Sequence, residues 1–421
     1  MQAFGKRNGL AYGLMGLPLA FVALPLYVIL PNHYAREFGV PLATLGAILL
    51  GARLFDAFID PLLGRLSDRL FARSAAAVLA LGAVAAVVLA LGFAMLFFPL
   101  VKSPGALVVW ASVMLMVTYA AYSALSVSHQ SWGAMLGGNE AERSRIVAWR
   151  EGLGLIGVVL ASVTPVALGL PATTAIFFIA LVAGWLAWRT AVRPVAKADV
   201  PAHQPGAIWL PFKHASFRRL LGVFMLNGIA SAVPATLVLF FIQDRLQAPS
   251  TMEPLFLGSY FLSAALSIPL WLAVVKRLGL AASWLCGMVL AIAIFSWATQ
   301  VGAGQTGAFI AICALSGVAL GTDLALPGAL LAGVIQANGD SGKSEGAYFG
   351  WWNFATKLNL ALAAGLALPL LGLFGYAPGV RDPQALSALV VAYCVLPCVL
   401  KLAAASGLYF FILKPLKSAA T

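Results

Sequence analysis

Two carboxylates and one guanidinium lie inside a stretch of this chain that is otherwise apolar enough to cross a bilayer. Arg53, Asp56 and Asp60 follow one another at spacings of three and four residues, so a helix places all three on one face. Charges in a bilayer core are costly unless they are paired or face water, so they mark functional sites by default. The single base can neutralise only one of the two acids, so the second acid needs a proton or a metal cation. We therefore expect a cation-coupling site, with a structural ion pair as the alternative.

The spacing of the two acids, Asp56 and Asp60, itself favours cation binding. Carboxylates one helical turn apart repel each other when both are charged. Either a proton or a small hard cation with oxygen ligands, such as Na⁺, relieves this repulsion. Pro61 adds an oxygen to the same turn, because its missing N–H leaves the carbonyl of Ala57 without its usual donor. The residues leave the choice between Na⁺ and H⁺ open.

The elements that must hold these side chains are membrane-spanning helices. Of the 421 residues, 62% are hydrophobic and 10% are charged, whereas a soluble domain has about 25% charged residues. Apolar runs close to the length of a spanning helix recur throughout the chain, and in lipid a run this long must be helical. The sequence predicts twelve spans, near residues 9–30, 41–63, 75–99, 106–130, 150–170, 172–192, 220–242, 255–275, 282–300, 307–335, 347–372 and 387–412.

The net charge of +12 would suit a nucleic-acid partner, but its distribution along the chain argues against one and instead reports orientation in the membrane. With the N-terminus taken as cytoplasmic, eighteen of the 26 Lys and Arg residues lie on the cytoplasmic side and four on the opposite side. This positive-inside asymmetry predicts that both termini lie in the cytoplasm. We expect an integral protein of the bacterial inner membrane. The chain has no metal-ligand spacing, nucleophile elbow or phosphate loop. We therefore expect no enzyme activity and no cofactor beyond the coupling ion.

A Pro-rich basic segment divides the spans into six and six. We predict an N-terminal six-helix bundle over residues 1–192, a cytoplasmic linker over 193–219 and a C-terminal six-helix bundle over 220–421. The fold class is thus an all-α polytopic membrane protein, expected to be a monomer whose partners are the lipid bilayer and a small or amphiphilic solute. In such a layout the substrate site lies between the halves, near the membrane midplane.

The connection after the second span resembles a signature of the major facilitator superfamily. Gly64, Asp68, Arg69 and Arg73 match the pattern G-x-L-x-D-R-x-x-x-R in sequence, in span number and in predicted side. The resemblance implies the twelve-helix major facilitator fold and a gating motif. In that motif Gly64 allows close helix contact and Asp68 caps or pairs across the gate. Arg69 and Arg73 reach acidic helix ends.

A longer pattern, from Asp56 through Arg69, resembles the glycoside–pentoside–hexuronide:cation symporters, the melibiose permease family. The stretches from Glu142 to Arg150 and from Glu345 to Leu358 also resemble that family, so the likeness covers both halves. It implies that Asp56 and Asp60 bind Na⁺, Li⁺ or H⁺. Ile59 stands where members often have a polar ligand, which weakens the case for Na⁺ and leaves H⁺ open.

Other polar residues within the spans are candidates for the solute cavity. The resemblance implies that Lys357 faces this cavity near the two acids, against the alternative of a snorkelling lysine. Arg150 is implied similarly, with an interfacial ion pair to Glu151 as the alternative. Asp323 lies four residues before Pro327, where we expect a kink in the helix. We expect Asp323 to contact the substrate or the gate, with a structural hydrogen bond as the alternative. The remaining cavity candidates are Ser128, Asn353 and Trp132. Trp132 offers a stacking face for a sugar, with anchoring at the membrane interface as the alternative.

The chain departs from the sugar-binding members at two places that bear on the solute. Its first span is apolar from Leu10 to Leu30, and Ser128 stands where those members use an acid. By family resemblance a sugar or glycoside remains the leading solute. The missing carboxylates favour an alternative, a lysophospholipid or another amphiphile with an anionic or zwitterionic head. Proton-driven efflux is a third reading, and a non-transporting receptor is the least favoured.

Overall fold

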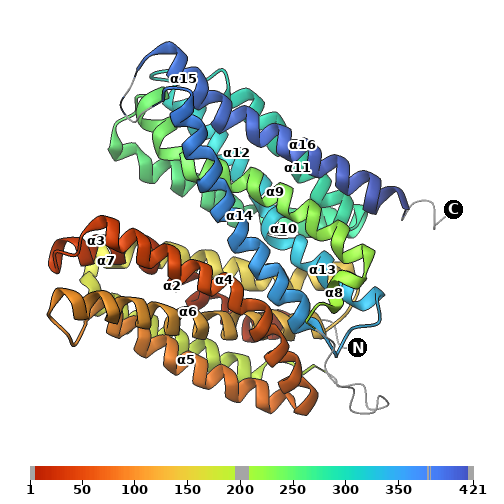
Figure 1. Cartoon of the computed structure of the whole chain (residues 1–421). Coiled ribbons are helices and arrows are strands. Elements are labelled where there is room, and N and C mark those ends of the chain that lie inside the picture. Colours follow the sequence, from red (N-terminus) through yellow and green to blue (C-terminus); the bar gives the residue numbers. More distant parts are fainter. Residues whose placement is uncertain (1–4, 195–207, 377–378, 380, 416–421) are drawn as a thin grey trace. The chain divides into compact units, whose positions relative to one another are not determined.

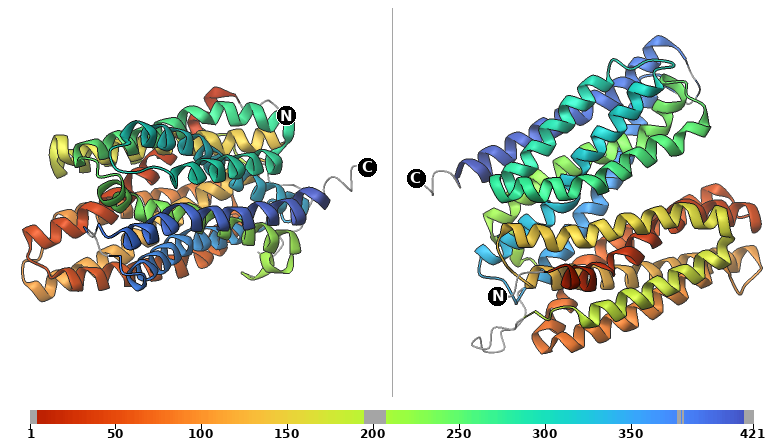
Figure 2. Two further views of the ribbon diagram at one scale, coloured as in Figure 1. Left: turned by 90° about the horizontal axis from the view of Figure 1, so that it is seen from above. Right: turned by 180° about the vertical axis from the view of Figure 1, so that it is seen from behind.

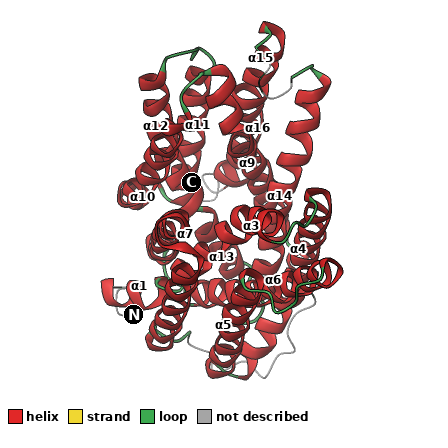
Figure 3. Cartoon of the chain, turned by 90° about the vertical axis from the view of Figure 1, so that its left-hand side faces the viewer, coloured by secondary structure: helices red, strands yellow, loops and turns green. Residues whose placement is uncertain are grey.

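The structure, a computed structural model, describes residues 5–194, 208–376, 379 and 381–415, and within these ranges it consists of helices joined by loops (Figure 3). The chain forms two compact units. One comprises Met1–Lys213 with Ala332–Phe354, and the other comprises His214–Leu331 with Ala355–Thr421. The all-α class expected from the apolar runs is confirmed.

The first unit opens with short helical segments and continues with four long helices (Figure 1). The short segments are α1 (Lys6–Gly13), α2 (Gly16–Leu24), the π-helical η1 (Pro25–Ile29) and α3 (Leu30–Glu37). The long helices are α4 (Leu42–Arg73), α5 (Ala75–Phe97), α6 (Pro104–Met135) and α7 (Glu140–Thr190), and α8 (Leu210–Lys213) follows. α6 packs against both α4 and α5, and α2 packs on α7, in the red-to-yellow bundle of Figure 2.

The long helix α7 contains the two spans predicted near residues 150–170 and 172–192. Gly169, with φ +80°, breaks the helix between them, and this left-handed conformation suits a residue without a Cβ. The helix begins at Glu140, ahead of the apolar run, because Asn139 and Glu142 form a capping box. The Asn139 side chain accepts from the Glu142 N–H, and the Glu142 carboxylate accepts from the Asn139 N–H. The predicted start of this helix was therefore too late.

The second unit contains the remaining helices, four of whose segments are short π or 3₁₀ turns. In order they are α9 (Ala215–Phe240), η2 (Phe241–Arg245), η3 (Ser250–Met252), α10 (Glu253–Leu278), α11 (Leu280–Ala298), α12 (Thr306–Ala325), α13 (Pro327–Ala337), α14 (Glu345–Leu373), α15 (Pro383–Val390), η4 (Val391–Val395), α16 (Leu396–Leu408) and η5 (Tyr409–Leu413). α12 packs against α10 and α11, and α16 packs against α9 and α11. The last part of α13, from Ala332, and the first part of α14, up to Phe354, belong to the first unit.

The predicted kink near Asp323 is confirmed. α12 ends at Ala325 and α13 starts at Pro327, which cannot donate the backbone hydrogen bond that would continue the helix. The Leu330 N–H then bonds to the Leu326 carbonyl and restarts the helical ladder. Pro327 thus divides the span predicted near 307–335 into two helices.

The predicted spans correspond to helices of sufficient length. Among the described residues, ten helical stretches are long and apolar enough to cross a membrane. α4 and α14, with 32 and 29 residues, are not among these ten, but both are long enough to span and coincide with the spans predicted near 41–63 and 347–372. The first unit also includes Ala332–Phe354, which the predicted boundaries 1–192 and 220–421 assign to the second bundle.

Candidate functional site

The predicted coupling residues lie on one uninterrupted helix, α4. Asp56 and Asp60 are both fully buried, at 1% and 0% exposure. Pro61 lies inside the helix, so the carbonyl oxygen of Ala57 receives no backbone hydrogen bond from that position. Two carboxylates and a backbone oxygen are thereby gathered within little more than one helical turn.

A residue of α6, Ser123, contacts this site although the sequence did not single it out. Its hydroxyl donates to Oδ1 of Asp56 at 2.7 Å, and the serine itself is buried. Ser128, the serine of the same helix that we predicted to line the cavity, is also buried, and its hydroxyl has no hydrogen-bond partner among the described residues. A polar residue in an apolar helix was the available signal, but only packing tells which one reaches the acid.

Arg53, the base expected to pair with the acids, has its guanidinium over an aromatic ring. Its Cζ lies 4.4 Å from the centre of the Tyr27 ring, which is cation–π geometry. Tyr27 comes from η1 and in turn approaches Tyr119 of α6, at 6.0 Å between ring centres. Arg53 is thus positioned by aromatic side chains of the first and fourth spans. Its charge pairing stays a prediction.

The motif at the end of α4 holds the first turn of α14. The Asp68 carboxylate is buried and accepts from the backbone N–H groups of Gly346 and Ala347, at 2.6 and 2.8 Å. These are among the first N–H groups of the helix, which have no partner within it. Gly64 faces Gly346 so closely that a Cβ on either residue would meet the carbonyl oxygen of the other. The close contact and the capping expected of Gly64 and Asp68 are therefore present here, within the first unit. Arg69 and Arg73 are exposed.

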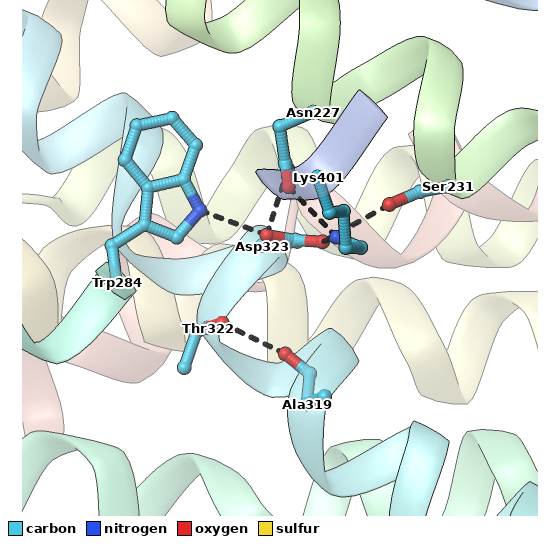
Figure 4. A network of polar contacts seen from close by, with 7 residues as sticks. All are labelled: Asn227, Ser231, Trp284, Ala319, Thr322, Asp323 and Lys401. Atoms are coloured by element: carbon cyan, nitrogen blue, oxygen red, sulfur yellow. Dashed lines mark hydrogen bonds and ion pairs between the residues drawn. The ribbon is translucent and has the colours of Figure 1, made fainter. Parts of the chain in front are cut away.

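In the second unit, Asp323 is the centre of a polar network that joins four helices (Figure 4). Its Oδ1 accepts from Asn227 Nδ2 at 2.9 Å and from Trp284 Nε1 at 2.8 Å. Its Oδ2 accepts from Ser231 Oγ at 3.2 Å and forms an ion pair with Lys401 Nζ at 3.1 Å. Lys401 also donates to Asn227 Oδ1 at 2.7 Å. This geometry matches the structural hydrogen-bond interpretation of Asp323, and its contact with substrate stays a prediction.

Lys401, the partner of Asp323, was not among the residues predicted from the sequence. A lysine in the middle of the last apolar run and an acid in the tenth span were both visible, and intramembrane charges tend to pair with each other. Their separation along the chain hid the pairing, since only the packing of α16 beside α9 and α11 brings the two together.

Removing Lys401 is expected to destabilise the protein strongly. Lys401→Met leaves a nearly buried carboxylate uncompensated, and loss of one partner of a buried pair costs about 3–5 kcal/mol. The double variant Lys401→Met/Asp323→Asn removes both charges and should recover much of this loss. Thermal unfolding in detergent measures the effect, with Lys276→Met, an exposed lysine of α10, as the matched control. Equal melting of Lys401→Met and wild type would refute the role of the pair.

Two further cavity candidates, Arg150 and Trp132, make contacts with neighbouring protein groups that fit roles other than solute binding. Arg150 donates from Nε and Nη2 to one oxygen, Oε1, of Glu151, at 2.9 and 2.5 Å, so its geometry is that of the alternative ion pair. Trp132 is completely buried, and its ring contacts those of Trp188 and Phe71, at 5.5 and 6.0 Å between ring centres. Its indole N–H donates to a backbone carbonyl of residue 192. Protein occupies the faces of this ring, which argues against the stacking on a sugar that the sequence predicted.

Two candidates on α14, Asn353 and Lys357, are half-buried. They fall on either side of the boundary between the units, with Asn353 in the unit of Asp56 and Asp60 and Lys357 in the other. The pairing of Lys357 with the acids stays a prediction.

Comparison with known proteins places these residues within a transporter fold. The sequence model of the family described as MFS/sugar transport protein matches residues 8–414. No curated protein sequence matches the chain significantly.

Solved structures of transporters are similar in fold. A bacterial homologue of the iron transporter ferroportin, in an outward-facing state, has TM-score 0.71 and 15% identity, covering 96% of this chain and 98% of that one. The fucose:proton symporter of E. coli has TM-score 0.65 and 14% identity, covering 93% and 98%. A human organic anion transporter has TM-score 0.66 and 16% identity, covering 96% and 100%. At these identities the likeness shows the fold alone, which is the major facilitator fold.

Proposed function

We propose, on the premise that this chain belongs to the family described as MFS/sugar transport protein, that it is a secondary active transporter coupling Na⁺ or H⁺ entry to uptake of a small organic solute. The observation that carries this proposal is the pair of buried carboxylates, Asp56 and Asp60, one turn apart on α4. Membership of this family makes the chain an integral membrane transporter rather than an enzyme. The coupling ion, the solute and the melibiose permease subfamily belong to the proposal.

The two acids supply the chemistry that coupling needs. An empty pair carries two negative charges in a medium where charge is costly, and one bound cation offsets half of this charge. The hydroxyl of Ser123 fixes the orientation of Asp56 by donating to its Oδ1. The carbonyl of Ala57 offers a further oxygen ligand for Na⁺, whereas a proton needs only one carboxylate.

The solute we propose is a sugar or glycoside, the class that the family resemblance implies. A second class, a lysophospholipid or other amphiphile, is favoured by the composition of the first span. Its core segment, α2, carries no charged residue, and Phe21 stacks on Phe177 at 5.6 Å. Such a span gives a neutral disaccharide no carboxylate to bind its hydroxyls, whereas Lys357 can attract an anionic head. Proton-driven efflux leaves the paired acids and this lysine less well explained.

A transport panel tests the solute class. Purified protein in liposomes is assayed under an inward Na⁺ or H⁺ gradient with a neutral disaccharide, an aryl glycoside and a lysophospholipid. We expect cation-dependent, saturable uptake of the solutes with an apolar part to exceed that of the disaccharide by about tenfold, the value of one unpaired buried polar group. Lys357→Gln should lower uptake of the anionic solute most.

The opposite ranking would overturn the inference from the missing carboxylates. Saturable, cation-dependent uptake of the neutral disaccharide without competition by amphiphiles would identify a sugar symporter of the ordinary kind. In that case the residues that bind sugar hydroxyls lie outside the first span and position 128.

A further inference from the structure

A groove on the surface of the second unit is not used by the proposed transport function. It lies between α9 and α16 with η5, and its volume is about 660 Å³, within the range of pockets that hold small ligands. Arg218 and Arg219 line one part of it. Its wall is formed by Val223, Leu226 and two phenylalanines of η5, Phe410 and Phe411.

The charged part of this groove favours an anion. Arg218 and Arg219 are exposed and stand near the beginning of α9, whose first turn contains no acidic residue. The positive end of the helix dipole adds to the field of the two guanidinium groups. Among the residues that line the groove none is acidic. A phosphate group bound here would make charge-assisted hydrogen bonds with both arginines.

The rest of the groove favours a hydrocarbon chain. Phe410 and Phe411 are 58% and 54% exposed, although both are large and apolar. Gly222 leaves the floor open, since a Cβ there would meet nothing within 4 Å. The groove thus combines an apolar wall with two arginines. In a bilayer, the ligand that matches both features is a lipid with an anionic head.

We propose that this groove binds an anionic phospholipid, with its phosphate on Arg218 and Arg219 and one acyl chain along Val223, Leu226 and Phe411. The positive-inside asymmetry predicts that the start of α9 is cytoplasmic, where basic pockets between spanning helices hold anionic head groups. Arginine suits this role because its planar guanidinium binds phosphate oxygens in pairs. The groove lies within one unit, so the proposal is independent of how solute is transported.

Native mass spectrometry of the full chain, titrated with phosphatidylglycerol or phosphatidylcholine, tests this site. We expect preferential retention of phosphatidylglycerol. Arg218→Gln/Arg219→Gln should weaken it about tenfold or more, as two basic contacts imply. The matched control Lys276→Gln/Arg277→Gln removes an exposed basic pair at the end of α10 and should leave it unchanged. Gly222→Leu, whose Cβ would meet nothing within 4 Å, places an apolar side chain in the groove and should weaken binding while both arginines remain.

Several outcomes would overturn the proposal. If wild type retained the two lipids equally, the groove would not select an anionic head. The same conclusion would follow if wild type and the double arginine variant retained phosphatidylglycerol equally. Undiminished binding by Gly222→Leu would show that no acyl chain occupies it. Displacement of the lipid by millimolar inorganic phosphate alone would assign the arginines to a simple anion site.

Discussion

Asp56→Asn and Asp60→Asn are each expected to abolish accumulation of solute against its gradient. Asparagine keeps the size and most hydrogen bonds of aspartate, but it cannot carry a proton and provides no charge to hold Na⁺. Because both acids are buried on α4, loss of either leaves one carboxylate that no longer needs a cation to relieve repulsion. Uptake into liposomes under an imposed cation gradient measures the loss, which should reach the background of empty liposomes.

Two controls separate coupling from folding. Glu37→Gln removes an exposed carboxylate and should transport as wild type. Ser123→Ala removes the hydroxyl that orients Asp56 and should shift the cation concentration for half-maximal uptake without abolishing transport. Gradient-driven accumulation by the Asp56→Asn/Asp60→Asn variant would remove both residues from the coupling site.

Gly64→Ala is expected to impair transport severely through the contact between α4 and α14. The added methyl would meet the carbonyl oxygen of Gly346, so the helices must separate and weaken the two hydrogen bonds that Asp68 accepts. Gly51→Ala on the same helix is the matched control, because its Cβ meets nothing within 4 Å. In a helix alanine is favoured over glycine by about 1 kcal/mol, so the control should be neutral or slightly stabilising.

Initial uptake rate and thermal stability should be measured together for both glycine variants. We expect Gly64→Ala to lose at least about tenfold in rate, which corresponds to about 1.4 kcal/mol in the barrier. Asp68→Asn should act in the same direction, since an amide offers one acceptor oxygen where the carboxylate offers two. Equal rates for Gly64→Ala and Gly51→Ala would show that the close approach is not needed for transport.

The membrane fold could be predicted because its determinants are local. Apolar runs of spanning length and Pro327 as a helix break are properties of neighbouring residues. The early start of α7 was also local, in the Asn139 and Glu142 capping box, but it lies outside the apolar run that defined the span. Hydropathy finds the part of a helix that lipid covers and misses the part that extends beyond it.

The candidate site could be predicted only in part, because its partners are distant in sequence. The spacing of Asp56 and Asp60 on one helix identifies the acids, but nothing near them in the chain identifies Ser123 as the donor. The same holds for Asp323 and Lys401, which meet through the packing of separate helices. At Trp132 the local sequence does not distinguish a buried aromatic residue from one that stacks on a solute, and its complete burial favours the first.

The steady-state ratio of internal to external solute tests cation coupling most directly. Protein in liposomes receives an inward Na⁺ gradient, an inward H⁺ gradient, or neither, and the solute is the best substrate of the panel. The account predicts a ratio well above one with at least one of these cations. It further predicts collapse to one when an ionophore dissipates that gradient, and a ratio of one in the Asp56→Asn/Asp60→Asn variant. A wild-type ratio of one under both gradients, with rapid equilibration of solute, would contradict cation-coupled transport.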